Sequence, residues 1–498
     1  MNVNPITRLD YPDLDVIRVE DTYYMVSTTM HFMPGCEILQ SFDLVHWEHV
    51  TYVYETLDHT DAQQLKSGQN IYGQGMWAAS LRYHEGRFYI CFVANDTRKT
   101  YLYTSEKIDG PWKKQLIEGF YHDASLLFDE DGRNYIVYGN DEIWITELNE
   151  DLTAPKKDGL HRLLVSDHKN PELGYEGSHI QKINGYYYIF LVHSLRDRWM
   201  RTEACFYSDS LEGEFTGGDV LCDDRGYCGQ GVAQGGIVDT PDGKWYAMLF
   251  QDSGAVGRIP ILLPVTWKDH FPFFGQNGHV PEEIEVHSTR PGYIYQPLVG
   301  SDDFCNGLLP RWQFNHDPDP RYYHLDALQG TYTITTREVC TELTQAVNTL
   351  TQRMSYPSCA AEVTVDASAL KEGDVAGLCA LQGCYAAVGI TKHHGKYEVL
   401  MLDKKEDGIL DMTEGTVVES HQMDFRLEAD FCNMKDEARC YYRVNKGDWL
   451  PIGTVHKLYF KLDHFTGCRF GLFCYAAEKT GGSACFRDFK YYDVDEIS

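Results

Sequence analysis

The sequence lacks several features that would assign it to a membrane or secretory class. It has no apolar run of about 18 residues, so nothing in it predicts a membrane-spanning helix. Its first residues, MNVNPITRLDYPD, carry neither a basic segment nor an apolar stretch of the signal-peptide type. The 15 cysteines show no CxxC spacing, which predicts reduced, mostly buried thiols rather than disulfides or a zinc site. We therefore expect a cytoplasmic protein.

Basic residues are also scarce. Lys and Arg number 44 against 74 Asp and Glu, for a formal net charge of −30. Nucleic acids and anionic membranes are bound by clusters of Lys and Arg, which this chain lacks, so both are excluded as expected partners. A small neutral oligosaccharide is compatible with such a charge. The sequence leaves the oligomeric state open, a homo-oligomer included.

The composition favours strands. Aromatic residues make up 13% of the 498 residues, with 34 Tyr, and 43 Gly punctuate the chain, whereas amphipathic helical stretches are rare. A chain of this length exceeds one ordinary core, and we expect two domains.

One pattern occurs five times: a tight turn, two bulky residues and an alternating strand. Its shared tyrosines are roughly 46 to 65 residues apart, a period that fits one four-stranded propeller blade. The Asp-Gly and Asn-Gly pairs within it predict type I′ hairpins. Five copies predict an all-β fold that begins with a five-bladed β-propeller over residues 1–290. The shared tyrosines are Tyr24, Tyr89, Tyr135, Tyr188 and Tyr246.

The strand before each hairpin is expected to line the central channel, because the first strand of a blade is innermost. Three of these strands carry an acid where they begin: Asp13, Asp123 and Glu176. The second strand carries Trp77 there, and the fifth carries Gln234. Repeat symmetry therefore predicts three carboxylates around one end of the channel.

Like charges repel, so a fold gains nothing structurally by gathering carboxylates around an axis. Glycoside hydrolysis does require them, as a general acid and as a base or nucleophile. Taken singly, Asp13 and Asp123 are more often turn residues that bond backbone N–H groups, and Glu176 is as readily structural as functional. Because all three acids occupy the same position in the repeat, together they favour glycoside hydrolysis. Trp77 would then provide an apolar face on which a sugar ring stacks.

The segments around these acids closely resemble glycoside hydrolase family 43. NPITRLDYPDLD is similar to the first-blade opening whose Asp is the general base, which implies that role for Asp13; Leu14 replaces the usual second Pro. HDASLLFDEDG resembles the third-blade segment whose Asp modulates the acid, implying Asp123. YEGSHI resembles the motif that carries the general acid, implying Glu176.

The same resemblance implies substrate-binding residues. Trp77 in WAAS is similar to part of the sugar-binding wall, and Phe32 in HFMPG matches an aromatic that lines the pocket. Arg258 in GAVGRIPILLPVTW matches an Arg that reaches the bound sugar, and we add Gln234 to this set. Many members hold a His near the fifth inner strand that can bind a central calcium. Because Ala233-Gln234 stands there, the resemblance leaves metal binding open.

The likeness continues beyond the linker at 287–300. Alternating strands and glycine-rich turns predict a β-sandwich over residues 300–498, jelly-roll or concanavalin-like, similar to that of the β-xylosidase branch. In that branch a sandwich loop carries an aromatic into the pocket mouth. His464-Phe465-Thr466-Gly467 matches this loop and implies Phe465 as a substrate contact.

The resemblance implies an exo-acting, inverting hydrolase that releases β-D-xylose from the non-reducing end of xylo-oligosaccharides. Asp13 would activate water, Glu176 would protonate the leaving oxygen, and Asp123 would keep the pKa of Glu176 high. An α-L-arabinofuranosidase, or a bifunctional enzyme, is the close alternative, and a non-catalytic carbohydrate-binding propeller the distant one. No cofactor is expected for the chemistry; a structural calcium is left open, in the propeller or at Asp302 and Asp303 in the sandwich.

Overall fold

Five four-stranded antiparallel sheets surround one axis, and the first strand of each sheet contacts the first strands of its neighbours. The computed structural model describes residues 2–461 and 465–493. The first two blades contain β2 (Asp15–Val19), β3 (Thr22–Val26), β5 (Gly35–Ser41) and β6 (Glu48–Tyr54), then β7 (Met76–His84), β8 (Arg87–Ala94), β9 (Lys99–Ser105) and β10 (Lys113–Ile117). The third contains β11 (Ser125–Phe128), β12 (Asn134–Asn140), β13 (Glu142–Leu148) and β14 (His161–Ser166). The last two contain β15 (Glu176–Ile183), β16 (Tyr186–Ser194), β17 (Arg201–Ser208) and β18 (Thr216–Leu221), then β19 (Ala233–Asp239), β20 (Trp245–Asp252), β21 (Arg258–Lys268) and β22 (Phe271–Phe274).

Some of the hairpin turns are the two-residue type I′ turns that the repeat predicts, and others are longer. Asn184 and Gly185 have φ of 50° and 85° and connect Ile183 directly to its partner Tyr186, as expected of a type I′ turn. The turns at Gly132 and Gly243 are longer than predicted, because the paired residues are Phe128 with Asn134 and Asp239 with Trp245. In each of these a glycine with φ near +80° closes a five-residue loop.

The ring closes where its first and last blades meet. Strand β1 (Asn2–Val3) pairs with β23 (Glu283–Ile284), which follows the fifth blade. Apolar side chains of the two blades form one cluster there, which includes Val16, Met25, Tyr246 and Leu262. Burial of this seam removes apolar area from water and holds the two ends of the propeller together.

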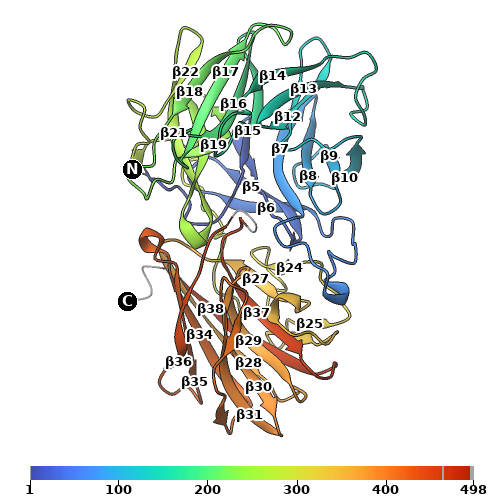
Figure 1. Ribbon diagram of the computed structural model, residues 1–498, viewed down its shortest axis with the longest axis vertical. Coiled ribbons are helices and arrows are strands. Elements are labelled where there is room, and N and C mark those ends of the chain that lie inside the picture. Colours follow the sequence, from blue (N-terminus) through green and yellow to red (C-terminus); the bar gives the residue numbers. More distant parts are fainter. Residues whose placement is uncertain (1, 462–464, 494–498) are drawn as a thin grey trace.

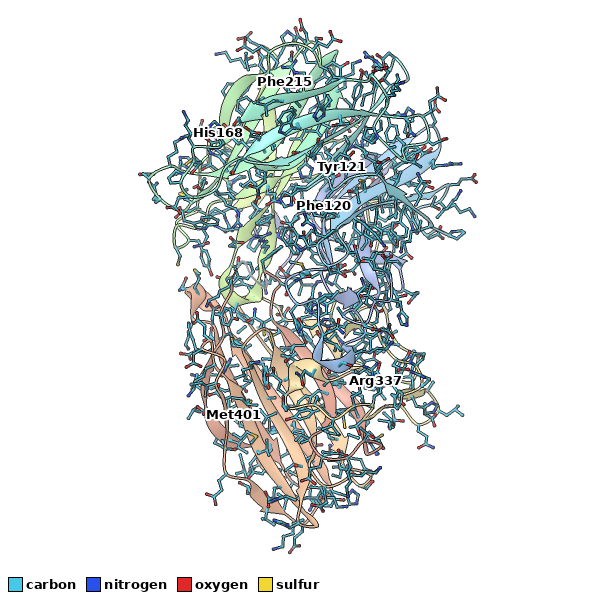
Figure 2. All side chains as sticks on the ribbon, turned by 45° about the vertical axis from the view of Figure 1, so that its right-hand side comes forward. Phe120, Tyr121, His168, Phe215, Arg337 and Met401 are labelled. Carbon is cyan, nitrogen blue, oxygen red and sulfur yellow. The ribbon has the colours of Figure 1, made fainter. Side chains whose placement is uncertain are left out.

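The second half of the chain forms two stacked sheets below the propeller (Figure 1). One contains β24 (Gln313–Asn315), β27 (Leu350–Arg353), β29 (Asp374–Leu381), β30 (Tyr385–His393), β31 (Lys396–Lys404), β32 (Leu410–Met412), β33 (Thr416–Val418) and β37 (Arg469–Ala476). The other contains β25 (Tyr323–Asp326), β26 (Thr331–Thr335), β28 (Ser358–Asp366), β34 (Gln422–Asp430), β35 (Glu437–Arg443), β36 (Leu450–Lys457) and β38 (Ser483–Asp493). Short 3-10 turns lie at η1 (Lys66–Gly68), η2 (Gly254–Val256), η3 (Leu343–Gln345) and η4 (Cys432–Met434). Alternate side chains of both sheets, Met401 among them, fill the core between the sheets (Figure 2).

The two halves share a strand. Strand β4 (Phe32–Met33) leaves the first blade and pairs with β24 of the sandwich. Arg337, at the upper edge of the sandwich, donates a hydrogen bond to the Gln64 carbonyl of the propeller at 2.9 Å (Figure 2). The buried Arg353 forms an ion pair with Glu37 at 2.8 Å. The sandwich is therefore attached through backbone pairing and buried charge.

The cysteines agree with the sequence prediction: all are free, and most are buried. Among the described residues, no helix has the length and apolar character needed to cross a membrane.

Candidate active site

A cavity of about 230 Å³ lies at the end of the channel where the innermost strands begin. It collects residues from all five blades and one from the sandwich. The lining residues are Asp13, Trp77, Ala78, His122, Asp123, Asn140, Leu173, Glu176, Trp199, Arg201, Gln234, Arg258 and Phe465. The structure thus brings together seven of the eight predicted site residues.

The backbone at the strand entrances is left-handed. Asp13, Asp123 and Gln234 have φ of 51°, 48° and 64°, and Gly177 has φ of 67°. Such conformations cost non-glycine residues energy and recur at functional sites. Glu176 therefore stands one residue before the position equivalent to Asp13 and Asp123, which corrects the predicted register. The fifth blade has the equivalent β-bulge, between Ala233 and Gly236, and there Gln234 itself takes the left-handed position.

Asp13 is fixed through both carboxylate oxygens. Arg258 donates to Oδ1 at 2.6 Å, and the Thr28 hydroxyl donates to Oδ2 at 2.7 Å. The carboxylate is 5% exposed and faces the cavity. A charge-assisted bond from a guanidinium fixes its orientation without taking its outer lone pairs, as a group that activates water requires.

Asp123 is a buried residue of the cavity wall. Its Oδ2 accepts a hydrogen bond from the Gly177 backbone N–H at 3.1 Å. Burial raises the pKa of Asp123 to about 6; the charges of Glu176 and Asp13 act in the same direction, whereas His122 opposes them. Asp123 therefore holds a proton more readily than an exposed aspartate.

Glu176 differs from the expectation that Asp123 would keep its pKa high. Burial would raise the pKa of Glu176, but hydrogen bonding and charge from His122, with the charges of Arg201 and Arg258, lower it overall. Its Oε2 also accepts a hydrogen bond from Asn140 at 2.7 Å. In the free protein Glu176 is thus held as an anion, because cationic neighbours outweigh the nearby carboxyls.

His122 is the neighbour that sequence analysis did not assign. Its Nε2 lies 3.5 Å from Asp123 Oδ2 and 3.6 Å from Glu176 Oε2. Desolvation opposes protonation of the ring, but the charges of Asp123 and Glu176 outweigh it and raise the pKa of His122 to about 9. Position could have identified this residue, since it directly precedes Asp123.

Two arginines, Arg201 and Arg258, line the cavity and share one buried aspartate. Arg258 donates to Asp252 at 3.2 Å, and Arg201 forms an ion pair with the same carboxylate. Burial lowers the pKa of Arg201 to about 9, with the charge of Arg258 adding to this effect. Sequence analysis also missed three lining residues that lie outside the innermost strands, because the repeat aligns only those strands. They are Asn140, Trp199 and Arg201.

Phe465 reaches the cavity from the sandwich, as the resemblance implied. Its ring meets Trp77 edge to face at a centroid distance of 4.9 Å. The Arg258 guanidinium lies 5.0 Å from the centroid of the Phe465 ring. The preceding His464 lies outside the described residues.

Phe32 does not line the cavity, contrary to the prediction. The residue is 2% exposed, and the Arg469 guanidinium covers its ring at 3.5 Å. The cause is the pairing of β4 with β24, which draws Phe32 into the boundary between propeller and sandwich.

The residues present do not fit a central calcium. At the channel centre, the Arg82 guanidinium donates to Asp15 at 2.7 Å and to the Ser125 hydroxyl at 2.6 Å. The other oxygen of Asp15 lies 3.1 Å from His179 Nδ1. The chain itself therefore supplies the cation that would balance Asp15.

Elsewhere the calcium prediction finds little support. Within the described part of the chain, His122, Asp123 and Glu176 form a trio whose donor atoms lie within 4.8 Å of one another. Calcium takes six to eight oxygen ligands, which one imidazole and two carboxylates do not provide. In the sandwich, Asp302 accepts hydrogen bonds from Trp312 Nε1 and the Phe304 N–H, each at 2.8 Å.

Comparison with known proteins agrees with this geometry. Residues 3–272 match the model for glycosyl hydrolases family 43, and residues 301–492 match the β-xylosidase C-terminal concanavalin A-like domain. A β-xylosidase of Formosa agariphila is 26% identical over 99% of this chain and 89% of its own length. A xylosidase/arabinosidase of Butyrivibrio fibrisolvens is 23% identical over 99% of each chain.

Solved structures show the same arrangement. A bifunctional GH43-CE protein of Bacteroides eggerthii superimposes with a TM-score of 0.92 and 41% identity over the whole of this chain, which spans 64% of that longer protein. An engineered family-43 enzyme described as both endo-xylanase and exo-arabinofuranosidase gives a TM-score of 0.88 and 28% identity over 99% of each chain. With the family model covering more than half of its residues, the chain belongs to glycosyl hydrolase family 43 and is a glycoside hydrolase.

Proposed function

We propose that this glycosidase is an exo-acting, inverting β-xylosidase that removes single xylose residues from the non-reducing end of xylo-oligosaccharides. The observation that carries the proposal is the closure of a small carboxylate-lined cavity by Phe465 of the sandwich. A volume of about 230 Å³ is below the usual range of ligand pockets and suits one terminal sugar ring rather than the middle of a polymer.

The proposed mechanism assigns one step to each carboxyl group. Asp13, oriented by Arg258 and Thr28, removes a proton from water as the water attacks the anomeric carbon. Glu176, oriented by Asn140, protonates the leaving oxygen on the other face of the sugar. Asp123 lies beside the acid and couples its protonation to that of Glu176.

Release of α-L-arabinofuranose is the second candidate, supported by the names of relatives. The Butyrivibrio protein is described as a xylosidase/arabinosidase, and a 25% identical protein of Bacteroides ovatus as a non-reducing-end α-L-arabinofuranosidase. The second covers only 66% of this chain, whereas the β-xylosidase of Formosa covers 99%, and we therefore rank xylose first.

The test compares hydrolysis of p-nitrophenyl β-D-xylopyranoside and p-nitrophenyl α-L-arabinofuranoside under identical conditions. We expect the higher kcat/KM on the xyloside, and a preference for arabinoside would reverse the ranking. Proton NMR of the fresh p-nitrophenyl β-D-xylopyranoside digest, in which only the glycone is released as xylose, should show α-xylose first; β-xylose as the first product would exclude inversion.

The acid itself is tested by Glu176→Gln. We expect kcat on xylobiose to fall by about 10²- to 10⁴-fold, because the unactivated leaving group needs the proton. A dinitrophenyl xyloside, whose leaving group needs no proton, should lose much less activity. Equal losses on both substrates would contradict the assignment.

A further inference from the structure

His122 lies between the two acids that line one side of the cavity. Its buried Nε2 is 3.5 Å from Asp123 and 3.6 Å from Glu176, so a small movement makes a hydrogen bond to either carboxyl. The Trp77 ring meets the imidazole edge to face at 5.7 Å and limits how far the imidazole can turn. No step of the proposed mechanism so far uses this histidine.

The surroundings of His122 contain charges of both signs. Asp123, Glu176 and Asp13 favour its protonation, whereas the charges of Arg201 and Arg258 stabilise the Glu176 anion. Asn140 is neutral and donates to Oε2 of Glu176, the same oxygen that His122 faces. The imidazole and the amide therefore approach one oxygen of the acid together.

This arrangement raises a question about the catalytic proton. A general acid must be protonated when the glycosidic bond breaks, yet the cations around Glu176 lower its pKa. The pKa of the imidazole beside it is raised to about 9. At neutral pH the pair thus holds one proton, and in the free enzyme that proton resides on the imidazole.

We infer that His122 stores the proton that Glu176 delivers to the leaving oxygen, and so acts on the reaction through Glu176 as a positioning residue. The inference rests on the proposed function. When a sugar displaces water from the cavity, separated charges become less favourable and the neutral pair gains. The proton then moves from Nε2 to Oε2, which leaves a neutral imidazole and a neutral carboxyl group.

Each later proton transfer has a donor and an acceptor in the site or in solvent. The carboxyl O–H of Glu176 gives its proton to the glycosidic oxygen as the bond from that oxygen to the anomeric carbon breaks. Water supplies the new bond to carbon and gives a proton to Asp13. After product release, solvent accepts the Asp13 proton and returns one to the imidazole, and no oxidant or metal takes part.

The first experiment measures kcat/KM on xylobiose against pH for the wild type and His122→Gln. A shared proton is lost only at the upper macroscopic pKa of the pair, so the wild-type rate should hold to about pH 9. Without the imidazole, Glu176 holds the proton alone. The alkaline limb should then fall at lower pH, and the rate at pH 8 should drop by about 10- to 100-fold.

Each other outcome overturns the inference. An alkaline limb at the wild-type position, with only a uniform loss of rate, would mean that His122 is merely structural. A limb at higher pH would mean that His122 only lowers the pKa of Glu176 as a fixed cation. His161→Gln is the matched control, because His161 lies on the outermost strand of the same blade and should leave the profile unchanged.

A second measurement needs no active variant. In ¹⁵N-histidine NMR of the wild type, the His122 resonance, identified by its loss in His122→Gln, should titrate near pH 9. In Glu176→Gln its midpoint should move down, because one of the two adjacent negative charges is gone. A wild-type midpoint near 6.5 would overturn the inference. A protein inactive on both pentosides yet titrating as expected would instead refute the proposed function.

Discussion

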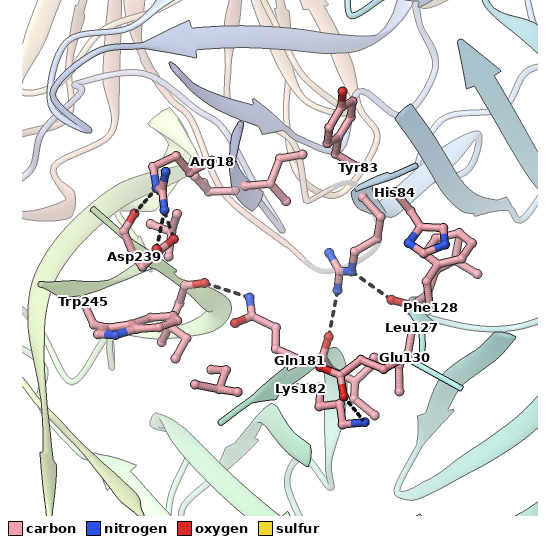
Figure 3. A pocket seen from close by; sticks show the side chains of 18 residues that line it. Arg18, Tyr83, His84, Leu127, Phe128, Glu130, Gln181, Lys182, Asp239 and Trp245 are labelled. Atoms are coloured by element: carbon pink, nitrogen blue, oxygen red, sulfur yellow. Dashed lines mark hydrogen bonds and ion pairs between the residues drawn. The ribbon is translucent and has the colours of Figure 1, made fainter. Parts of the chain in front are cut away.

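The propeller channel has two mouths, made by opposite ends of the same five strands. The active mouth is the end that holds Asp13, Asp123 and Glu176, and its cavity measures about 230 Å³. The far mouth is the other end, lined by Arg18, Lys182 and Asp239 among others, and its cavity is larger, about 440 Å³. Its acids are paired with cations: Arg18 with Asp239, and Lys182 with Glu130 (Figure 3). At the active mouth, Asp123 and Glu176 instead share one imidazole, and burial raises the pKa of Asp123. Volume alone would have selected the wrong end.

The difference shows how one set of strands separates stability from chemistry. At the far mouth each of these charges has an oppositely charged partner within ion-pair distance. Carboxyls that compete for a proton are poised to transfer it. Between the mouths, Arg82 connects Asp15 of the first blade to Ser125 of the third, so neither cavity opens freely into the other.

The largest expected effect comes from replacing the base at the active mouth. Asp13→Asn should lower kcat on xylobiose by about 10²- to 10⁴-fold, because an amide cannot accept the proton of water. The matched far-mouth variant, Arg18→Met, breaks a partly exposed ion pair and should cost at most about 1 kcal/mol of stability. Steady-state kinetics give kcat of both variants, and thermal melts give their stability. If kcat of Arg18→Met falls as far as that of Asp13→Asn, the two mouths do not differ in function as proposed.

A smaller effect is expected where the sandwich joins the active mouth. Buried Asp10 accepts hydrogen bonds from the Arg258 and Gly467 N–H groups, each at 2.7 Å, and so ties the Phe465 loop to the propeller. In Asp10→Asn the side-chain NH₂ replaces one carboxylate oxygen and faces a backbone N–H, so one hydrogen bond is lost. We expect this to lower the free energy of unfolding by about 1 to 3 kcal/mol. We expect KM for xylobiose to rise by about tenfold.

Phe465→Leu provides the comparison for that variant. It removes the aromatic face but leaves the Asp10 hydrogen bonds in place, so its KM should rise without a comparable fall in melting temperature. If Asp10→Asn melts lower than the wild type yet keeps the wild-type KM, Asp10 does not position the loop.

The smallest effect concerns a buried acid beside the active mouth. Glu203 is fully buried and accepts a hydrogen bond from the Gln234 N–H at 2.7 Å; among the described residues none forms an ion pair with it. Burial raises its pKa well above the ordinary value. Folding must therefore protonate Glu203 once the pH exceeds its unfolded pKa of about 4.3, and this cost grows as pH rises.

Glu203→Gln removes that cost. We expect its melting temperature to exceed the wild type by about 2 to 4 °C at pH 8 and to match it at pH 4.5. A variant that melts below the wild type at both values would show that the carboxylate is stabilised as an anion. The matched amide substitution, Asp239→Asn, removes the partner of Arg18 and should not stabilise the protein at either pH.

The fivefold repeat was sufficient to predict the propeller and one end of its channel. Five turn-and-strand copies sufficed for the blades, and an acid at the start of three innermost strands located one mouth of the channel. The sequence did not predict the one-residue offset of Glu176, because residue spacing does not show which residue of a strand entrance takes the left-handed conformation. Phe32 was misplaced because a two-residue strand that joins the other domain leaves no periodic signal.

By itself, the sequence determined the strand pattern, the excess of acids and the residues at each strand entrance, since these depend on local spacing. Tertiary structure alone decided which charges meet. Asp10 and Gly467 are distant in sequence and joined by a hydrogen bond. The position of His122 next to Asp123 can be read from the sequence, but its approach to Glu176 of the next blade is visible only in the fold. Protonation depends on burial and on charges a few ångströms away, and only the folded chain sets those distances.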